Sequence, residues 1–286
     1  MGRTTRILCE DIQFGEAPRW RQGRLWFSDF FAHAVKSISL AGDLRTEIEI
    51  DDQPSGLGWM PDGSLLFVSM IRRRLLRRSV DGDTSVHADL SQIAGFHCND
   101  MVVDSKGCAY VGEFGFDLAF EMKTRPIQSL VDGAAVAKLI RVAPDGRIVQ
   151  VIPDMHFPNG SVITPDNRTL IVAETLGRRL TAFDIAADGS LANRRVWAKI
   201  APRLPDGIAL DADGHVWVAN AGAPECVLFA PDGKVLEVID TGMPCYACML
   251  GGNDGRTLFM FTAMGVGAVK GKLLVATVDV PHDGRP

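Results

Sequence analysis

Residues 205–221, PDGIALDADGHVWVANA, have the pattern of a β-hairpin. Two runs rich in aliphatic, β-branched and aromatic residues flank the pair Asp213-Gly214, and Asp-Gly between such runs favours a tight hairpin turn. An acidic residue, Asp206, stands just before the first run. The stretch therefore predicts two antiparallel strands with a carboxylate where the first strand begins.

The same pattern occurs five more times along the chain. The copies are PRWRQGRLWFSDF (18–30), GLGWMPDGSLLFVSM (56–70), NDMVVDSKGCAYVGEF (99–114), NGSVITPDNRTLIVAET (159–175) and CMLGGNDGRTLFMFTA (248–263). The second turn residues serve as markers: Gly23, Gly63, Gly107, Arg168, Gly214 and Gly255. They recur at roughly 40 to 60 residues, an interval typical of one four-stranded propeller blade.

A second turn marker follows in each unit, and it predicts a second hairpin there. These markers are Gly42, Gly82, Gly146, Gly189, Gly233 and Gly271. The last unit has only one further strand, GKLLVATVDV, so we expect the amino-terminal segment RTTRILCE to supply the missing strand and close the ring, which removes free sheet edges. The sequence predicts an all-β fold, a six-bladed β-propeller with four antiparallel strands per blade, as a single domain over residues 1–286.

The third unit is longer than the others. Its two markers are about 20 residues further apart, and the excess falls within residues 114–137. A loop of this size beside a site would serve as a lid or as a substrate-contacting segment. The alternative is a surface insertion without a role in function.

Composition excludes several classes of protein. A formal net charge of −5 disfavours a nucleic-acid partner. No apolar run is long enough for a membrane helix, and the amino terminus lacks the apolar stretch of a signal peptide, so we expect a cytoplasmic protein with no membrane partner, as a monomer or small homo-oligomer. The six irregularly spaced cysteines are typical of reduced thiols, and the pair Cys245 and Cys248 lacks the second pair that a zinc site needs.

Polar residues coincide at the leading ends of the six predicted first strands, which line the central channel of a propeller. The residues at this level are Glu16, Gly56, Asn99 with Asp100, Asn159, Asp206 and Cys248. Carboxylate and amide oxygens suit a hard divalent cation such as Ca²⁺, whereas Zn²⁺ usually takes His or Cys. The sequence predicts an oxygen-lined metal site at the axial mouth. The alternative is that Asp206 and Asn159 only form Pro-Asp-Gly and Pro-Asn-Gly turns, but both precede a first strand instead of joining two strands.

Several of these motifs together resemble the SMP-30/gluconolactonase/luciferin-regenerating-enzyme family. They are GEAPRW (15–20), ND (99–100), PNG (158–160), PDG (205–207) and GGND (251–254), with the closing ATVDVP, so the resemblance covers essentially the whole chain. It implies a six-bladed propeller holding one divalent cation, usually Ca²⁺ and in some members Zn²⁺, with lactone hydrolysis as the commonest activity. It also implies Glu16, Asn159 and Asp206 as metal ligands, and Asn99 as a contact to the site and the substrate.

One position departs from the family pattern. Members that act on sugar lactones carry an Arg two residues before the Asn of the third unit, where this chain has His97. His97 is a candidate substrate contact, base or hydrogen-bond donor, with pocket lining as the alternative. An acidic substrate contact would fall near Asp117.

These residues predict a metal-dependent lactonase acting on a small-molecule lactone. The cation, Ca²⁺ with Zn²⁺ or Mn²⁺ as alternatives, would polarise the carbonyl while Asp206 activates water. The chain has no GxSxG motif, which argues against a serine hydrolase. Two alternatives remain open: a non-catalytic propeller used as a ligand sensor or protein-binding scaffold, and a family member with altered chemistry such as ester or phosphotriester hydrolysis.

Overall fold

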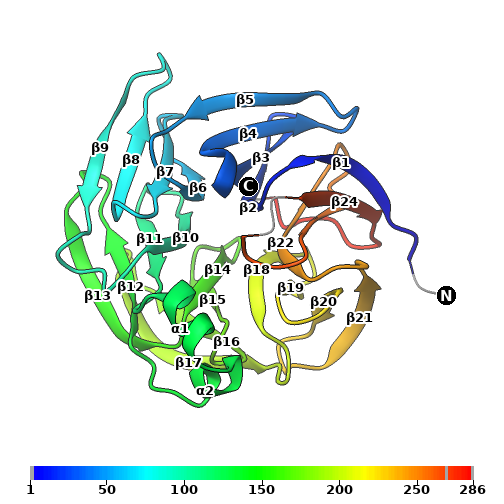
Figure 1. The fold of residues 1–286 in the computed structure, drawn as a ribbon. Helices are drawn as coiled ribbons and strands as arrows, with labels where there is room; N and C mark the ends of the chain where they lie inside the picture. The colour runs from blue at the N-terminus through cyan, green and yellow to red at the C-terminus, as the bar shows by residue number, and fades with distance from the viewer. Residues whose placement is uncertain (1–2, 268–269, 285–286) are drawn as a thin grey trace.

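The computed structural model describes residues 3–267 and 270–284 and is a six-bladed β-propeller (Figure 1). Each blade is a sheet of four antiparallel strands, which confirms the predicted fold. The first three blades are β2 (Gly15–Arg21), β3 (Arg24–Asp29), β4 (Ala34–Ser39) and β5 (Leu44–Glu49); β6 (Pro54–Trp59), β7 (Leu65–Ser69), β8 (Arg74–Arg78) and β9 (Thr84–Asp89); and β10 (Cys98–Val103), β11 (Ala109–Glu113), β12 (Ala137–Val142) and β13 (Ile148–Met155).

The last three blades follow the same order until the ring closes. They are β14 (Pro158–Ile163), β15 (Thr169–Glu174), β16 (Arg179–Ile185) and β17 (Leu191–Lys199); β18 (Pro205–Leu210), β19 (Val216–Asn220), β20 (Glu225–Phe229) and β21 (Val235–Asp240); and β22 (Cys245–Gly251), β23 (Thr257–Thr262), β24 (Gly271–Thr277) and β1 (Arg6–Ile12). β1 pairs with β24, with Arg6 opposite Val275, so the amino-terminal strand completes the sixth sheet as predicted.

Two of the predicted turn markers are wrong in detail. Gly42, Gly82, Gly146, Gly189 and Gly233 adopt positive φ in the turns before the fourth strands, but Gly271 begins β24 itself, because the fourth strand of that blade comes from elsewhere in the chain. In the first hairpin of the fourth blade, Asn167 (φ 57°) occupies the left-handed position and Arg168 follows it. Asn tolerates this conformation better than most residues do.

The innermost strands β2, β6, β10, β14, β18 and β22 pack side by side around the axis. Glycines permit the close approach: a Cβ on Gly160 would lie 2.6 Å from the carbonyl oxygen of Asp206, and one on Gly207 would lie 2.7 Å from the Cα of Ala247. Both glycines lie inside strands, so the PNG and PDG motifs are not turns here. The Pro-Asp-Gly sequences ending at Gly63, Gly146 and Gly233 are turns, with positive φ.

The segment 114–137 contains two short helices, α1 (Leu118–Thr124) and α2 (Ile127–Val131), between β11 and β12. Asp117 caps α1 by accepting a 3.0 Å hydrogen bond from the Phe120 amide. Leu130 of α2 packs against Phe157 and Leu176, so the insertion of the third blade covers loops of the fourth (Figure 1). No helix in the described ranges is long and apolar enough to cross a bilayer.

All six cysteines are free thiols, and every one except Cys9 is buried. Cys226, Cys245 and Cys248 belong to the apolar core between the fifth and sixth blades, together with Trp217 and Leu250. Burial raises the pKa of each of these three thiols, so they stay protonated and unreactive near neutral pH.

Candidate metal centre

A local irregularity occurs at the leading end of every innermost strand. The pairing register shifts after Glu16 in β2, Pro54 in β6, Cys98 in β10, Pro158 in β14, Pro205 in β18 and Cys245 in β22. Such bulges free one or two residues from the regular ladder and change the direction of their side chains. Glu16, Asn99, Asn159 and Asp206 all lie at these bulges, so one repeated backbone feature positions the predicted polar residues at the same level of the channel.

Glu16, Asn159 and Asp206 lie together at the axis, and each is buried. Asn159 contacts Asp206, while its Nδ2 donates to Thr175 Oγ1 (3.3 Å), which in turn donates to the carbonyl of Pro205 (2.7 Å). This chain of contacts joins the fourth and fifth blades and commits the amide hydrogens of Asn159. The oxygen of Asn159 is therefore the atom left for a ligand.

The two buried carboxyl groups repel one another when both are charged. Burial, then Asp206, then Asp100 raise the pKa of Glu16 well above its usual value. Burial and Asp100 likewise raise the pKa of Asp206, against a smaller lowering effect of Asn159. Asp100 itself is partly neutralised by Arg19, whose Nη2 lies 3.3 Å from Asp100 Oδ1 and also donates to the Met101 carbonyl.

The donor set fits a hard divalent cation. Asp206 Oδ1 is buried and has no hydrogen-bond partner among the residues that the structure describes, and an unpartnered buried carboxylate oxygen costs free energy unless a positive charge or donor approaches it. Two carboxylates and one carboxamide are ligands typical of Ca²⁺. The described residues contain no group of three or more His, Cys, Asp or Glu side chains that could hold a metal. The proposed centre is not such a group, because its third donor is the amide of Asn159.

The predicted substrate contacts lie on β10 (Asn99), just before it (His97) and at the start of α1 (Asp117). Asn99 Nδ2 donates to the Pro158 carbonyl (3.2 Å), which fixes the amide. His97 is half-buried, and its ring stacks on Phe96 with 4.1 Å between centroids. Burial lowers the pKa of His97 despite an opposing effect of Asp117, so the structure brings His97 and Asp117 into the same region. Asp117 is exposed and committed in part to capping α1.

The polar residue that ends the second strand of each blade was not predicted from the sequence. In four blades it accepts hydrogen bonds from the loop before the innermost strand: Asp29 from Phe14 N (2.9 Å), Glu113 from Phe96 N (3.1 Å), Glu174 from His156 N (2.7 Å) and Asn220 from Leu204 N (3.1 Å). These loops lead directly to Glu16, Asn99, Asn159 and Asp206. The signal was present, since a polar residue occupies this position in all six quoted hairpins.

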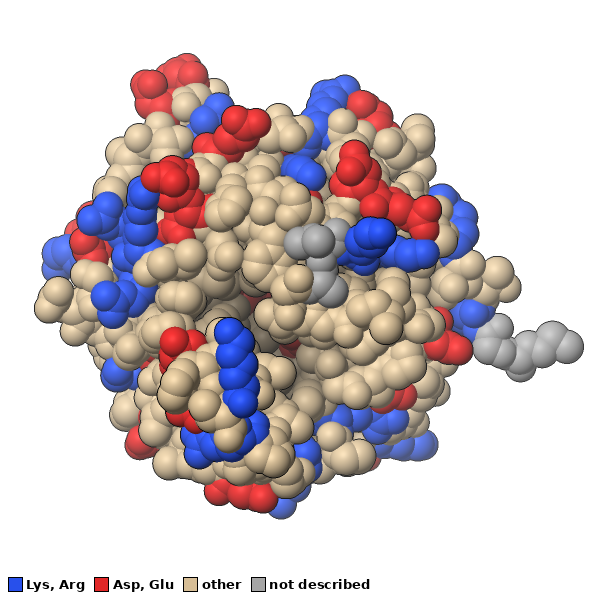
Figure 2. Space-filling model, in the orientation of Figure 1, with Lys and Arg blue, Asp and Glu red and all other residues tan. Residues whose placement is uncertain are grey.

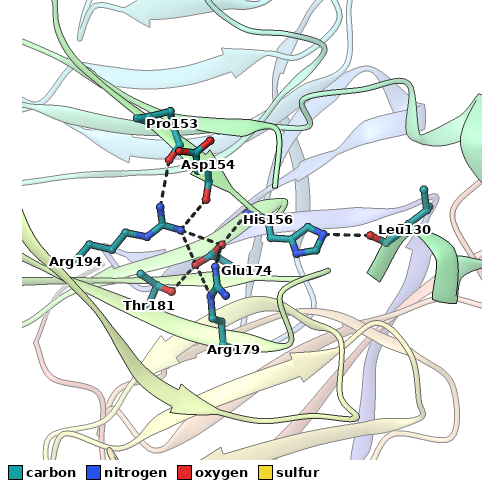
Figure 3. A network of polar contacts seen from close by, with 8 residues as sticks. All are labelled: Leu130, Pro153, Asp154, His156, Glu174, Arg179, Thr181 and Arg194. Carbon is teal, nitrogen blue, oxygen red and sulfur yellow. Dashed lines mark hydrogen bonds and ion pairs between the residues drawn. The ribbon is translucent and has the colours of Figure 1, made fainter. Parts of the chain in front are cut away.

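The most extensive of these anchors surrounds Glu174 (Figure 3). Its carboxylate is fully buried and accepts from Arg179 Nε (2.9 Å) and Nη2 (2.8 Å), from the Thr181 hydroxyl and, at 3.4 Å, from Arg194. The adjoining His156 ring contacts the Leu130 carbonyl of α2 at 3.1 Å. The network holds the β13–β14 loop, which ends at Asn159, and ties the insertion to it.

The opposite end of the channel has a different character. A cavity of about 480 Å³ opens there, bordered by the trailing ends of the innermost strands, among them Trp59, Val103, Ile163 and Leu210. Arg19 also borders this cavity while pairing with Asp100, so the Arg19–Asp100 pair separates it from the acidic centre. The cavity contains none of the predicted ligands.

Together, the fold and this centre define a six-bladed β-propeller with oxygen donors gathered at one end of its axis. Residues 14–264 match the family described as the SMP-30/Gluconolactonase/LRE-like region. The chain belongs to this family, which confirms the resemblance seen in the sequence.

Three relatives illustrate the match. The chain is 27% identical to the pentonolactonase XacC of Haloferax volcanii over 272 residues, covering 92% of this chain and 86% of the relative. It is 30% identical to the 6-deoxy-6-sulfogluconolactonase of Pseudomonas putida over 263 residues, covering 89% and 84%. The solved structure of regucalcin from Agrobacterium tumefaciens superposes with a TM-score of 0.82 at 21% identity, covering 99% and 97%. The names of the sequence relatives support lactone hydrolysis at the level of the family.

Proposed function

We propose that this protein is a divalent-cation-dependent lactonase, a hydrolase that opens the ring of a small-molecule lactone. The observation that carries the proposal is the buried, unpartnered Asp206 Oδ1 beside Glu16 and Asn159, because a scaffold or sensor has no use for uncompensated carboxylates at its axis. Lactonase names among relatives support the same reaction.

Glu16, Asn159 and Asp206 would hold the cation, Ca²⁺ first by donor chemistry, with Mn²⁺ or Zn²⁺ as alternatives. When bound, the cation would supply the positive charge that polarises the acyl carbonyl and lets both buried carboxyl groups ionise. Ionised Asp206 accepts a proton from the attacking water as the water oxygen bonds to the carbonyl carbon. The ring C–O bond then breaks, and its oxygen takes up the proton from Asp206, which gives the hydroxy acid and returns Asp206 to its ionised form.

Other side chains of the site orient the substrate. Asn99 is fixed by its bond to Pro158, and its carboxamide oxygen accepts no hydrogen bond from the described part of the chain. Burial, together with Asp206 and Glu16, raises the pKa of Tyr246 to about 12, so its hydroxyl remains a hydrogen-bond donor at neutral pH. His97 and Asp117 complete the proposed contacts at the side of the insertion, which would serve as a lid.

The test is a pH-indicator assay on a panel of sugar, aliphatic and aryl lactones, with protein stripped by EDTA and then given Ca²⁺, Mn²⁺ or Zn²⁺. We expect activity to vanish on chelation and to return with a cation, and Asp206→Asn to lose both activity and cation-dependent thermal stabilisation. Asp211→Asn is the matched control, because Asp211 is a buried carboxylate just after the far end of the same strand. Hydrolysis that survives chelation would refute the proposal.

A further inference from the structure

Aromatic and apolar side chains gather at the end of the propeller that bears the acidic centre. They form a contiguous cluster, called here the aromatic wall, made of Phe14, Phe30, Phe31, Met70, Phe114, Ala221, Tyr246 and Ala263. The rings are in contact, with centroid distances of 4.8 Å from Phe14 to Tyr246 and 5.7 Å from Phe14 to Phe31. Because these residues come from several blades, the wall is built by the closed ring and not by one loop.

The wall borders the proposed reaction centre directly. Phe14 precedes Glu16 by two residues, and Tyr246 lies on β22, which packs against β18 and β2, the strands that bear Asp206 and Glu16. Phe31 and Phe114 remain only half-buried, so the wall keeps accessible surface. Figure 2 shows the same face, where a central hollow is bordered mostly by uncharged residues, with basic and acidic atoms at its lower edge and acidic atoms visible within it.

His97 extends the wall on the side of the insertion. Its ring lies 4.1 Å from that of Phe96 and 6.0 Å from that of Phe114, between centroids. Its ring nitrogens make no hydrogen bond within the described residues. His97 thus places an imidazole stacked on Phe96 where the sugar-lactonase pattern places a fixed positive charge.

Polar side chains at this end of the propeller are largely committed to the protein itself. Asp29, Glu113, Glu174 and Asn220 accept from backbone amides, while the hydroxyls of Ser69 and Thr262 donate to Asp52 and to the Lys272 carbonyl. Of the polar contacts proposed above, Asn99, Tyr246 and His97 remain for the several hydroxyls of a sugar. Burying an unpaired hydroxyl against an aromatic surface costs binding free energy.

Resting on the proposed lactonase function, we propose that the substrate is a lactone bearing an aryl or branched alkyl group, which the aromatic wall holds while its carbonyl faces the acidic centre. A polyhydroxylated sugar lactone is the poorer substrate. Aromatic side chains contribute large apolar contact areas with preferred edge or offset geometry, so a phenyl group on the substrate gains from contact with Phe31 and its neighbours.

The experiment compares kcat/KM for three lactones: 3,4-dihydrocoumarin, which is aryl-fused, unsubstituted δ-valerolactone, and glucono-1,5-lactone. We expect dihydrocoumarin to exceed the sugar lactone by about 100-fold. Phe31→Ala should lower kcat/KM for dihydrocoumarin roughly 10-fold through KM and leave δ-valerolactone almost unchanged. Trp197→Ala is the matched control, because Trp197 is a half-buried aromatic residue on the outer strand β17, away from the axis.

The outcomes separate the two proposals. Preference for the sugar lactone, or an equal effect of Phe31→Ala on all three substrates, would overturn the inference and leave the lactonase function standing. If no lactone is hydrolysed with any cation, the lactonase function fails, and calorimetric binding of the ring-opened product, 3-(2-hydroxyphenyl)propanoate, then decides the inference. Binding weakened roughly 10-fold by Phe31→Ala but not by Trp197→Ala would support the wall as an aryl site, and no difference would overturn it.

Discussion

Removing the Glu174 carboxylate should destabilise the protein far more than removing an exposed acid of the same blade. In Glu174→Ala, the His156 amide and the Thr181 hydroxyl would lose their acceptor while remaining buried. Each unsatisfied buried donor costs about 1–3 kcal/mol. Arg179 and Arg194 have side chains 30% and 33% exposed, so water can solvate them in the variant. The expected loss is about 3–5 kcal/mol, the range for breaking a buried ion pair.

The assay is equilibrium unfolding in urea, followed by tryptophan fluorescence and compared at equal m-values. Asp184→Ala is the control, because Asp184 also pairs with an arginine of the fourth blade, Arg195 (2.6 Å), but its side chain is 45% exposed and the pair is screened by water. We expect no resolvable change in its unfolding midpoint. If the two variants unfolded at the same denaturant concentration, the assignment of Glu174 as the anchor of the β13–β14 loop would be wrong.

Three further predictions concern pH, backbone packing and the thiols. Burial raises the pKa of Glu174, but the hydrogen bonds from Arg179, Thr181 and the His156 amide lower it by more, so the net pKa is lowered. The ionised form therefore stabilises the fold at neutral pH. The difference in unfolding free energy between wild type and Glu174→Gln should shrink as pH falls below about 4. Gly160→Ala should lower both thermal stability, measured by differential scanning fluorimetry, and cation affinity, measured by calorimetry, because the new Cβ would press on the Asp206 backbone. Gly265 has open space around it, so Gly265→Ala should change neither quantity. In native protein a thiol reagent should modify Cys9 alone, and release of more than one equivalent of chromophore would contradict the packing of the other five cysteines.

Most of the fold could be predicted from the sequence because the blade is a repeated unit. Turn residues such as Gly63 and Gly214 recur with strand-like runs on both sides, and repetition strengthens signals that are weak singly. The shortened last unit also indicated ring closure, and the register of Asp206 and Asn159 placed them at the axis. Both residues lie there because the innermost strands of a propeller all begin at the same face.

What escaped prediction depends on contacts between distant segments. Arg19 pairs with Asp100, and Phe14 contacts Tyr246, only because the ring of blades is closed. The local periodicity of the sequence does not predict such contacts. Gly160 was ambiguous for a related reason: Pro-Asn-Gly is a turn sequence by itself, and only the neighbouring strand shows that the glycine serves close packing. The anchors Asp29, Glu113 and Glu174 were visible as a repeated polar position, but their hydrogen bonds to loop amides require the fold.

Ring closure by β1 also affects how the protein would respond to damage. Every sheet is flanked by two others, so one proteolytic nick in an exposed connection leaves the two fragments packed together across two separate interfaces. Loss of residues 6–12 has a different effect, because it exposes the edge of β24, which pairs with β1. This is the only sheet assembled from both ends of the described chain. Trimming there should expose backbone amides to intermolecular strand pairing, whereas internal nicks should leave a soluble, associated particle.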